Sequence, residues 1–188
     1  MKPAVFLDRD GTITEQTGYI NHPSRLVILP GVPEAVGLLN RNNYLVIVIS
    51  NQSGVARGYF PVTLVHEVHD FLKTDLREKG GTVDGIYFCP HHPQGIVPEY
   101  RRDCKCRKPK TGLIEQAQKV FDIDMSKSYM VGDRYLDIEL AHRINVKGIL
   151  VKTGYGLGEI EYVLPGRQKP AYIAEDLFGA ADWIVKGS

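Results

Sequence analysis

Short apolar runs rich in β-branched residues recur along the chain, and stretches of helical periodicity separate them. A strand that is covered on both faces needs no polar side, so runs of this kind are typical of buried parallel strands. The candidate strands are residues 4–7, 45–49, 86–88, 129–131 and 148–151. Their alternation with helices predicts an α/β fold with a doubly wound, mostly parallel sheet and helices on both faces.

Helical spacing is clearest where Leu64, Val68 and Leu72 mark one face of a long helix, and residues 33–40, 111–120 and 135–144 suit shorter ones. The closing run 181–185 is interpreted as a further edge strand. Two stretches fit neither pattern: the Pro-rich segment 89–106, and the segment 154–169, which contains four glycines and a proline. Neither resembles a second domain, so residues 1–188 are expected to form a single domain.

Charge and cysteine content narrow the class of protein. The 23 basic residues nearly balance the 22 acidic ones, which argues against nucleic acid or an anionic membrane as a partner. No signal peptide and no membrane-spanning apolar run is visible, so we expect a cytoplasmic protein, and we expect a monomer. The three cysteines gather between positions 89 and 106, which is typical of a metal site and not of a disulfide framework.

The first apolar run leads directly into Asp8-Arg9-Asp10-Gly11-Thr12. Asp8 and Asp10 lie two positions apart, on the same side of an extended chain. Such a pair can bind magnesium and divide the chemistry of phosphoryl transfer, one carboxylate attacking phosphorus and the other transferring protons. A bare Asp-x-Asp is more often a solvated turn, so other residues must decide between the two interpretations.

Two further apolar runs end in fitting residues. Residues 47–49 lead to Ser50, whose hydroxyl can donate to a phosphoryl oxygen, and residues 130–132 lead to Asp133, which can complete a magnesium shell. Lys108, within Arg107-Lys108-Pro109, can neutralise negative charge as it develops on the phosphoryl group. Each residue alone is as well explained as a turn former, a helix cap or a solvated charge; together they predict one phosphoryl-transfer site.

This order of motifs, DxDGT, a hydroxyl residue after a strand, Lys, and then GDxxxD, resembles that of the haloacid dehalogenase (HAD) superfamily of phosphotransferases. The resemblance implies that Asp8 is the nucleophile and Asp10 the general acid and base, whose backbone carbonyl also binds magnesium. It implies that Ser50 and Lys108 stabilise the phosphoryl group and that Asp133 is a magnesium ligand. Asp137 matches the second acidic position, but its helical spacing from Asp133 also suits a surface or supporting role, and we leave it outside the core site.

The segment 89–106 contains two pairs of soft ligands. The first pair is Cys89 with His91 or His92, and the second is Cys104 with Cys106. Twelve residues separate His91 from Cys104. Four such ligands predict a closed tetrahedral zinc site, which would order a Pro-rich loop that lacks its own core. The spacing alone does not choose between His91 and His92, and three free thiols remain the alternative.

The same loop resembles that of the heptose bisphosphate phosphatases of bacterial surface-sugar biosynthesis, in which FLDRDGT, NQSGVARG, CPHHPQG and CxCRKP occur with a zinc site. Almost the whole chain shares this resemblance, although residues 155–171 match poorly. It implies that the zinc ligands are Cys89, His91, Cys104 and Cys106. Because Arg107 follows the last of these ligands, a zinc-fixed loop would direct Arg107 and Lys108 at the substrate, as catalytic and specificity residues.

Matching the family further implies a substrate pocket and a substrate. The pocket residues carried over are Gln16, Tyr19, Asn51, Gln52, Ser53, Arg107, Lys108 and Arg134. The implied substrate is D-glycero-D-manno-heptose 1,7-bisphosphate, which loses its 7-phosphate to give heptose 1-phosphate for lipopolysaccharide or nucleotide-heptose precursors. The span from Asp10 to Ser50 is filled by a helix and a strand, so no cap domain is expected there and specificity must come from loops.

Three other functions fit parts of the pattern. A histidinol-phosphate phosphatase is the nearest, because the related histidine-pathway domain shares DRDGT and a similar Cys/His loop. A DNA 3′-phosphatase shares the superfamily motifs, but near-neutral charge and the lack of a basic aromatic groove argue against it. A zinc-stabilised binding module without catalysis is the alternative from another class. His22, His66, His69 and His142 are assigned no catalytic role.

Overall fold

The computed structural model describes residues 1–187 of the chain. Within these residues the strands form a six-stranded, fully parallel sheet in the order β3-β2-β1-β4-β5-β6. The strands are β1 (Ala4–Leu7), β2 (Leu45–Asn51), β3 (Gly85–Cys89), β4 (Tyr129–Gly132), β5 (Lys147–Val151) and β6 (Tyr172–Ala174). The helices are η1 (Pro23–Arg25), α1 (Val32–Arg41), α2 (Val62–Glu78), α3 (Gly112–Gln118), η2 (Met125–Lys127), α4 (Tyr135–Arg143), α5 (Gly156–Gly158), η3 (Glu159–Val163) and α6 (Leu177–Val185).

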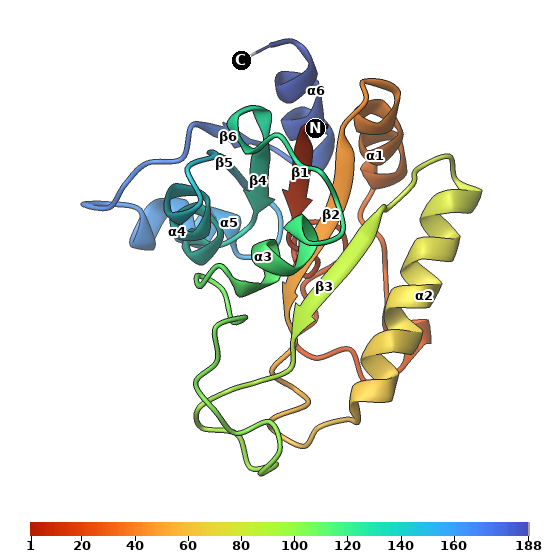
Figure 1. Cartoon of the computed structure of the whole chain (residues 1–188), viewed down its shortest axis with the longest axis vertical. Helices are drawn as coiled ribbons and strands as arrows, with labels where there is room; N and C mark the ends of the chain where they lie inside the picture. The colour runs from red at the N-terminus through yellow and green to blue at the C-terminus, as the bar shows by residue number, and fades with distance from the viewer. Residues whose placement is uncertain (188) are drawn as a thin grey trace.

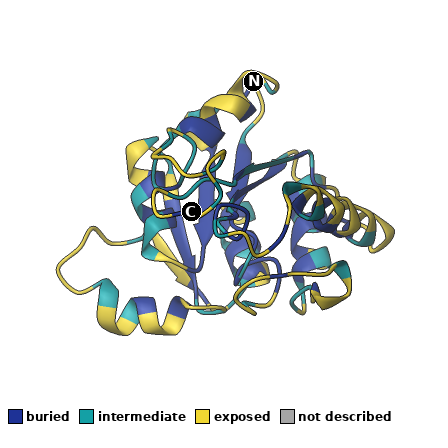
Figure 2. Cartoon of the chain, turned by 90° about the horizontal axis from the view of Figure 1, so that it is seen from below, coloured by how far each residue is buried: buried dark blue, intermediate teal, exposed yellow. Residues whose placement is uncertain are grey.

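Strand β1 lies at the centre of the sheet because it pairs with β2 on one side and β4 on the other. Alternate residues of the strands face opposite layers of helices. Leu7 packs in a core with α1, α2 and α6, whereas Phe6 packs in a second core with α3 and α4. Figure 2 shows the resulting buried centre between exposed outer helix surfaces. The predicted doubly wound sheet with helices on both faces is confirmed.

The interpretation of residues 181–185 as an edge strand is wrong, because they end helix α6, and the edge strand is β6. The carboxylate of Asp176 accepts from the Gly179 N–H (2.8 Å) and caps the helix. The buried residues Leu177, Ala181 and Ile184 recur at helical spacing and pack in the same core as α1. The β-branched Ile184 and Val185 favour a strand locally, but the cap and the helical spacing of the buried residues determine a helix.

The span between the first two strands contains no cap domain, as expected: every residue of 11–44 is described, and the span holds loops, η1 and α1. Isolated bridges join Thr14 to Asp10 and to Ile28 and fold this loop against the end of β1. Among residues 1–187, no helix is both long and apolar enough to cross a membrane.

The carboxyl ends of the strands meet at one edge of the sheet, where Figure 1 shows the arrowheads of β1, β3 and β4 pointing the same way. The strand order changes direction at β1, because β2 and β3 lie on one side of it and β4, β5 and β6 on the other. Open α/β sheets bind ligands at such a switch point. The Cys/His segment that follows β3 extends beyond the same edge (Figure 1).

Candidate active site

Lys108 and two carboxylates form a buried ion-paired group at the end of β1. The Lys108 ammonium lies 2.8 Å from Oδ1 of Asp8 and 2.7 Å from Oδ1 of Asp137. Asp8 follows β1 and Asp137 lies in the first turn of α4, so the contact joins segments distant in sequence. Asp137 is fully buried, and the surface role considered for it is wrong; its supporting role beside Lys108 is the one that the structure has.

Asp133 completes an acidic cluster with Asp8 and Asp137, whose carboxylate oxygens lie within 4.8 Å of one another. Oδ2 of Asp133 accepts from the Tyr155 N–H at 2.9 Å, whereas its buried Oδ1 has no hydrogen-bond partner among residues 1–187. Gly11 and Gly154 approach the Asp133 carboxylate so closely that a Cβ on either would lie 2.0 or 2.2 Å from Oδ2. A side chain at either glycine would therefore clash with the Asp133 carboxylate.

The pKa values of this cluster reflect burial and excess negative charge. Burial, followed by the neighbouring Asp8, raises the pKa of Asp133 to about 8. Burial also raises the pKa of Asp137 to about 7, although Lys108 opposes it. Burial alone would lower the pKa of Lys108, but Asp137 and Asp8 outweigh it and raise this pKa. An unpartnered oxygen among crowded carboxylates is a donor set that fits a magnesium ion.

Asp10 lies in a different environment from Asp8. The Arg9 guanidinium donates from Nη2 to both carboxylate oxygens of Asp10 at 2.7 Å and from Nε to Oδ1 at 2.9 Å. Gln52 donates to Oδ2 of Asp10 at 2.8 Å and accepts from Arg9 at 3.0 Å. His69 of α2 lies 3.1 Å from Arg9, and burial, followed by the Arg9 charge, lowers its pKa to about 3. Neutral His69 is therefore the acceptor for Arg9.

The residues that follow β2 divide between supporting and pocket-lining positions. Ser50 is buried and its hydroxyl accepts from the Gln52 amide at 2.8 Å. Asn51 holds the backbone of Lys108 on both sides, accepting from its N–H at 3.0 Å and donating to its carbonyl at 3.2 Å. Asn51 thereby fixes the position from which the Lys108 side chain enters the cluster.

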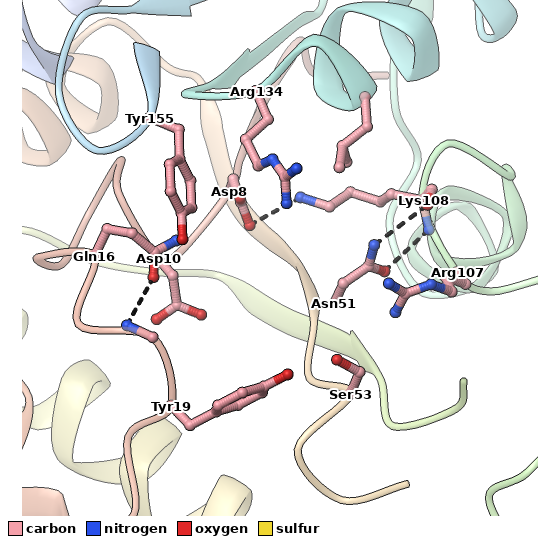
Figure 3. A pocket seen from close by; sticks show the side chains of 12 residues that line it. Asp8, Asp10, Gln16, Tyr19, Asn51, Ser53, Arg107, Lys108, Arg134 and Tyr155 are labelled. Carbon is pink, nitrogen blue, oxygen red and sulfur yellow. Dashed lines mark hydrogen bonds and ion pairs between the residues drawn. The ribbon is translucent and has the colours of Figure 1, made fainter. Parts of the chain in front are cut away.

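A pocket of about 220 Å³ opens onto Asp8 and Asp10. Figure 3 shows its side chains converging from several loops. The predicted site residues that line it are Asp8, Asp10, Gln16, Tyr19, Asn51, Ser53, Arg107, Lys108 and Arg134. Ser50, Gln52 and Asp133 lie buried behind this lining. The predicted residues are thus brought together, while their individual roles stay predictions.

Sequence reasoning missed Arg9, His69 and Tyr155. Arg9 stands between two aspartates but folds back onto one of them, and its contact with His69 spans 60 positions, so no local pattern reveals it. Tyr155 lines the pocket and follows the end of β5. The rule that functional residues follow the strands of a parallel sheet would have found Tyr155.

The Cys/His cluster forms where it was predicted. The three sulfur atoms of Cys89, Cys104 and Cys106 lie 3.1–3.3 Å apart, and Nδ1 of His91 lies 3.3 Å from Sγ of Cys106. His92 lies outside the group, with Nε2 3.2 Å from Arg57. The geometry therefore places His91, and not His92, with the thiols.

Three thiols and an imidazole nitrogen within 4.8 Å of one another are a donor set that fits zinc. Arg102 contacts Nε2 of His91 at 2.6 Å, on the side of the ring away from the Nδ1 that faces the thiols. Beyond the cluster, Arg107 and Lys108 follow Cys106 directly into the pocket.

A parallel sheet of this order, with an Asp-x-Asp pair after β1 and Lys108, Asp133 and Asp137 around it, defines a hydrolase of the HAD class. A family model described as HAD-hydrolase-like matches residues 105–180. A D-glycero-D-manno-heptose-1,7-bisphosphate 7-phosphatase from Thermosynechococcus vestitus is 43% identical over 187 residues, covering 97% of this chain and 95% of that protein.

A D-glycero-beta-D-manno-heptose-1,7-bisphosphate 7-phosphatase from Escherichia coli K12 is 39% identical over 184 residues, covering 97% of this chain and 88% of that protein. The crystal structure of a D,D-heptose 1,7-bisphosphate phosphatase from B. bronchiseptica, complexed with magnesium and phosphate, superposes with a TM-score of 0.87 at 29% identity and covers 99% of both chains. This chain belongs to the D-glycero-D-manno-heptose-1,7-bisphosphate 7-phosphatase family, a group of phosphoric monoester hydrolases.

The Cys/His geometry predicts which histidine binds zinc. We expect His91→Ala to weaken zinc binding by more than roughly tenfold, because it removes a donor of the cluster. We expect His92→Ala to keep its zinc, since this side chain contacts Arg57 instead. Zinc retained per chain after dialysis against a graded chelator measures both. Equal loss of zinc from the two variants would contradict the assignment.

The acidic cluster predicts how pH affects the protein without magnesium. Because the pKa values of Asp133 and Asp137 are raised to about 8 and 7, the folded chain holds more protons than the unfolded chain between about pH 4 and 8. Stability should therefore fall as pH rises through this window. We expect the magnesium-free protein to melt about 3 °C or more lower at pH 8 than at pH 6, and Asp133→Asn to reduce this difference. Calorimetry at both pH values tests this, and a pH-independent Tm would contradict it.

Proposed function

We propose that this chain is a magnesium-dependent phosphatase that removes the 7-phosphate of D-glycero-D-manno-heptose 1,7-bisphosphate and gives heptose 1-phosphate. The observation that carries the proposal is the group at the base of the pocket, where the Asp8 carboxylate is paired with Lys108 at 2.8 Å beside the unpartnered oxygen of Asp133. The substrate follows from the names of relatives that match nearly the whole chain. Such an enzyme would supply surface-polysaccharide or nucleotide-heptose precursors.

Asp8 acts as the nucleophile in this proposal. An oxygen of its carboxylate attacks phosphorus, the bond from phosphorus to the sugar oxygen breaks, and an aspartyl phosphate remains. Lys108 donates to a phosphoryl oxygen, and the Ser50 hydroxyl does the same from the end of β2. The Asn51 contacts to the Lys108 backbone keep the ammonium at the reacting group.

Asp10 transfers the protons. It lines the pocket, so in its protonated form it can give its proton to the departing sugar oxygen. The resulting carboxylate then takes a proton from the water that attacks the aspartyl phosphate, which releases inorganic phosphate and restores Asp8. Arg9 and Gln52 hold the Asp10 side chain for these two steps by hydrogen bonds to both oxygens.

Two metals belong to the proposal. Asp8, Asp133 and the backbone carbonyl of Asp10 would hold magnesium, which when bound neutralises the carboxylates and attracts the substrate phosphate. Cys89, His91, Cys104 and Cys106 would hold a structural zinc. Arg107 then stands at a fixed place in the pocket wall, where it recognises the sugar phosphate together with Gln16, Tyr19, Ser53 and Arg134.

The remaining features of the proposal concern the whole chain. We infer a monomer that works in the cytoplasm and folds as a single domain. Balanced charge favours a small metabolite over nucleic acid as the substrate, because phosphate-backbone binding relies on a basic surface.

A variant of the nucleophile tests the mechanism. We expect Asp8→Asn to lower kcat by roughly 10³-fold or more, because an amide cannot form the phosphorylated intermediate. Asp103→Asn is the matched control, since this aspartate is exposed and should leave kcat unchanged. Phosphate release with saturating magnesium gives both values, and circular dichroism checks that the variants fold. Substantial turnover by Asp8→Asn would remove the nucleophile assignment.

A substrate panel tests the specificity. The panel contains both anomers of heptose 1,7-bisphosphate, other sugar phosphates, histidinol phosphate and a 3′-phosphorylated oligonucleotide. We expect kcat/KM to be at least about tenfold higher for one heptose bisphosphate anomer than for histidinol phosphate, because two cationic side chains besides Lys108 line the pocket. A preference for histidinol phosphate would replace the substrate, and no turnover of any compound would favour a binding module.

A further inference from the structure

The segment that follows β5 is attached directly to the active site. We call residues 153–164 the tail segment. The Thr153 hydroxyl donates to the Gly11 carbonyl at 2.6 Å, and the Tyr155 N–H donates to Oδ2 of Asp133 at 2.9 Å. The segment thus contacts both the turn after β1 and a carboxylate of the acidic cluster. These contacts place Tyr155 in the pocket wall, near Gln16 in Figure 3.

Two side chains of the tail segment contact Arg134. Nε of Arg134 lies 3.5 Å from Oε1 of Glu159, and its guanidinium carbon lies 5.2 Å from the centroid of the Tyr155 ring. Glu159 is itself fixed, being 9% exposed and accepting from the Tyr135 N–H through Oε2 at 2.9 Å. A carboxylate at Nε and an aromatic ring at the guanidinium leave the terminal nitrogens of Arg134 available toward the pocket.

The charges in the pocket show why the position of Arg134 matters. Lys108 is buried between two carboxylates, and in the proposed function it contacts the phosphoryl group that is removed. The other cations in the described lining are Arg107 and Arg134. A half-exposed arginine loses rotamer freedom when it binds an anion, and an arginine already held by its neighbours loses less.

We propose that Tyr155 and Glu159 are positioning residues that hold Arg134 at the pocket mouth, where it binds the substrate phosphate that is not removed. The proposal rests on the function proposed above and deepens it, because it assigns the tail segment to substrate recognition. Tyr155 also forms part of the wall beside the sugar. The chemical class that this arrangement selects is a sugar carrying a second anionic group.

Glu159 also makes a structural contact, and a test must separate the effect of this contact from that of the ion pair with Arg134. Its Oε2 accepts from the first N–H of α4, which stabilises that helix end. Glu159→Gln keeps an oxygen for this hydrogen bond and removes the charge that pairs with Arg134. Glu161→Gln makes the same chemical change at an exposed position two residues away and serves as the control.

The test is a double-mutant cycle between Glu159 and Arg134. We expect Glu159→Gln to raise KM for heptose 1,7-bisphosphate about three- to tenfold and to change kcat less than about twofold. We expect KM for p-nitrophenyl phosphate, which lacks a second anionic group, to change less than about twofold. Tyr155→Leu should raise KM for the bisphosphate about two- to fivefold.

The coupling decides the interpretation. In an Arg134→Met background, Glu159→Gln should change KM for the bisphosphate less than about 1.5-fold, because the group that it positions is gone. An effect of Glu159→Gln that is equal with and without Arg134, or equal for the two substrates, would overturn the positioning role. An effect of Glu161→Gln as large as that of Glu159→Gln would overturn it too.

The same double-mutant cycle is repeated in proteins that carry Asp8→Asn. Titration calorimetry then measures the Kd of the bisphosphate, which does not depend on turnover. Coupling between Glu159 and Arg134 in binding, with a parent that does not hydrolyse the bisphosphate, would overturn the proposed function and support the positioning role. Hydrolysis by the parent without this coupling would overturn the positioning role alone. Absence of both would overturn the two proposals together.

Discussion

Three buried carboxylates gather at the end of strand β1, and the ammonium of Lys108 is paired with two of them, Asp8 and Asp137. Carboxylate oxygens of Asp8, Asp133 and Asp137 lie within 4.8 Å of one another, so when all three are ionised this buried group has an excess of negative charge. Burial and mutual repulsion oppose folding here, and they raise the pKa values of Asp133 and Asp137. The same excess attracts a divalent cation and, through it, a phosphate. Stability is thus lost at the place where the proposed chemistry requires charge.

Asp8 and Asp10 are two residues apart, yet the fold gives them different partners. Asp8 is paired with Lys108, which belongs to the loop after the cysteines, whereas Asp10 is held by Arg9 and Gln52. Arg9 is almost fully buried, so its charge is matched within the protein and not by water. Separating the environments of two carboxylates is how one site can hold a nucleophile beside a proton donor. The neutral, buried His69 of α2 contacts Arg9 and so links the residues around Asp10 to the helix layer.

The sheet and most of the candidate site could be predicted because both follow from local patterns. Buried parallel strands appear as apolar runs, and the residues that follow them meet at one edge of the sheet. This rule alone places Asp8, Ser50 and Asp133 close together. The errors have equally physical causes. The end of helix α6 resembles a strand because two of its residues are β-branched, but the Asp176 cap and the helical spacing of its buried residues determine the helix. The pairing of Asp137 with Lys108 joins positions 29 apart, and no periodicity specifies such a contact.

A site without a cap domain in the span after β1 must obtain its specificity from loops, and loops are costly to order. The structure orders the two sides of the pocket by different means. On one side the Cys/His cluster fixes the chain just before Arg107. On the other, hydrogen bonds from Thr153 and Tyr155 attach the tail segment to Gly11 and Asp133, and the segment in turn contacts Arg134. Arg134 is thus contacted by a segment anchored at Gly11 and Asp133, whereas Arg107 depends on the Cys/His cluster. Under the proposed function, the first of these contacts links recognition of the outer part of a substrate to the geometry around Asp8.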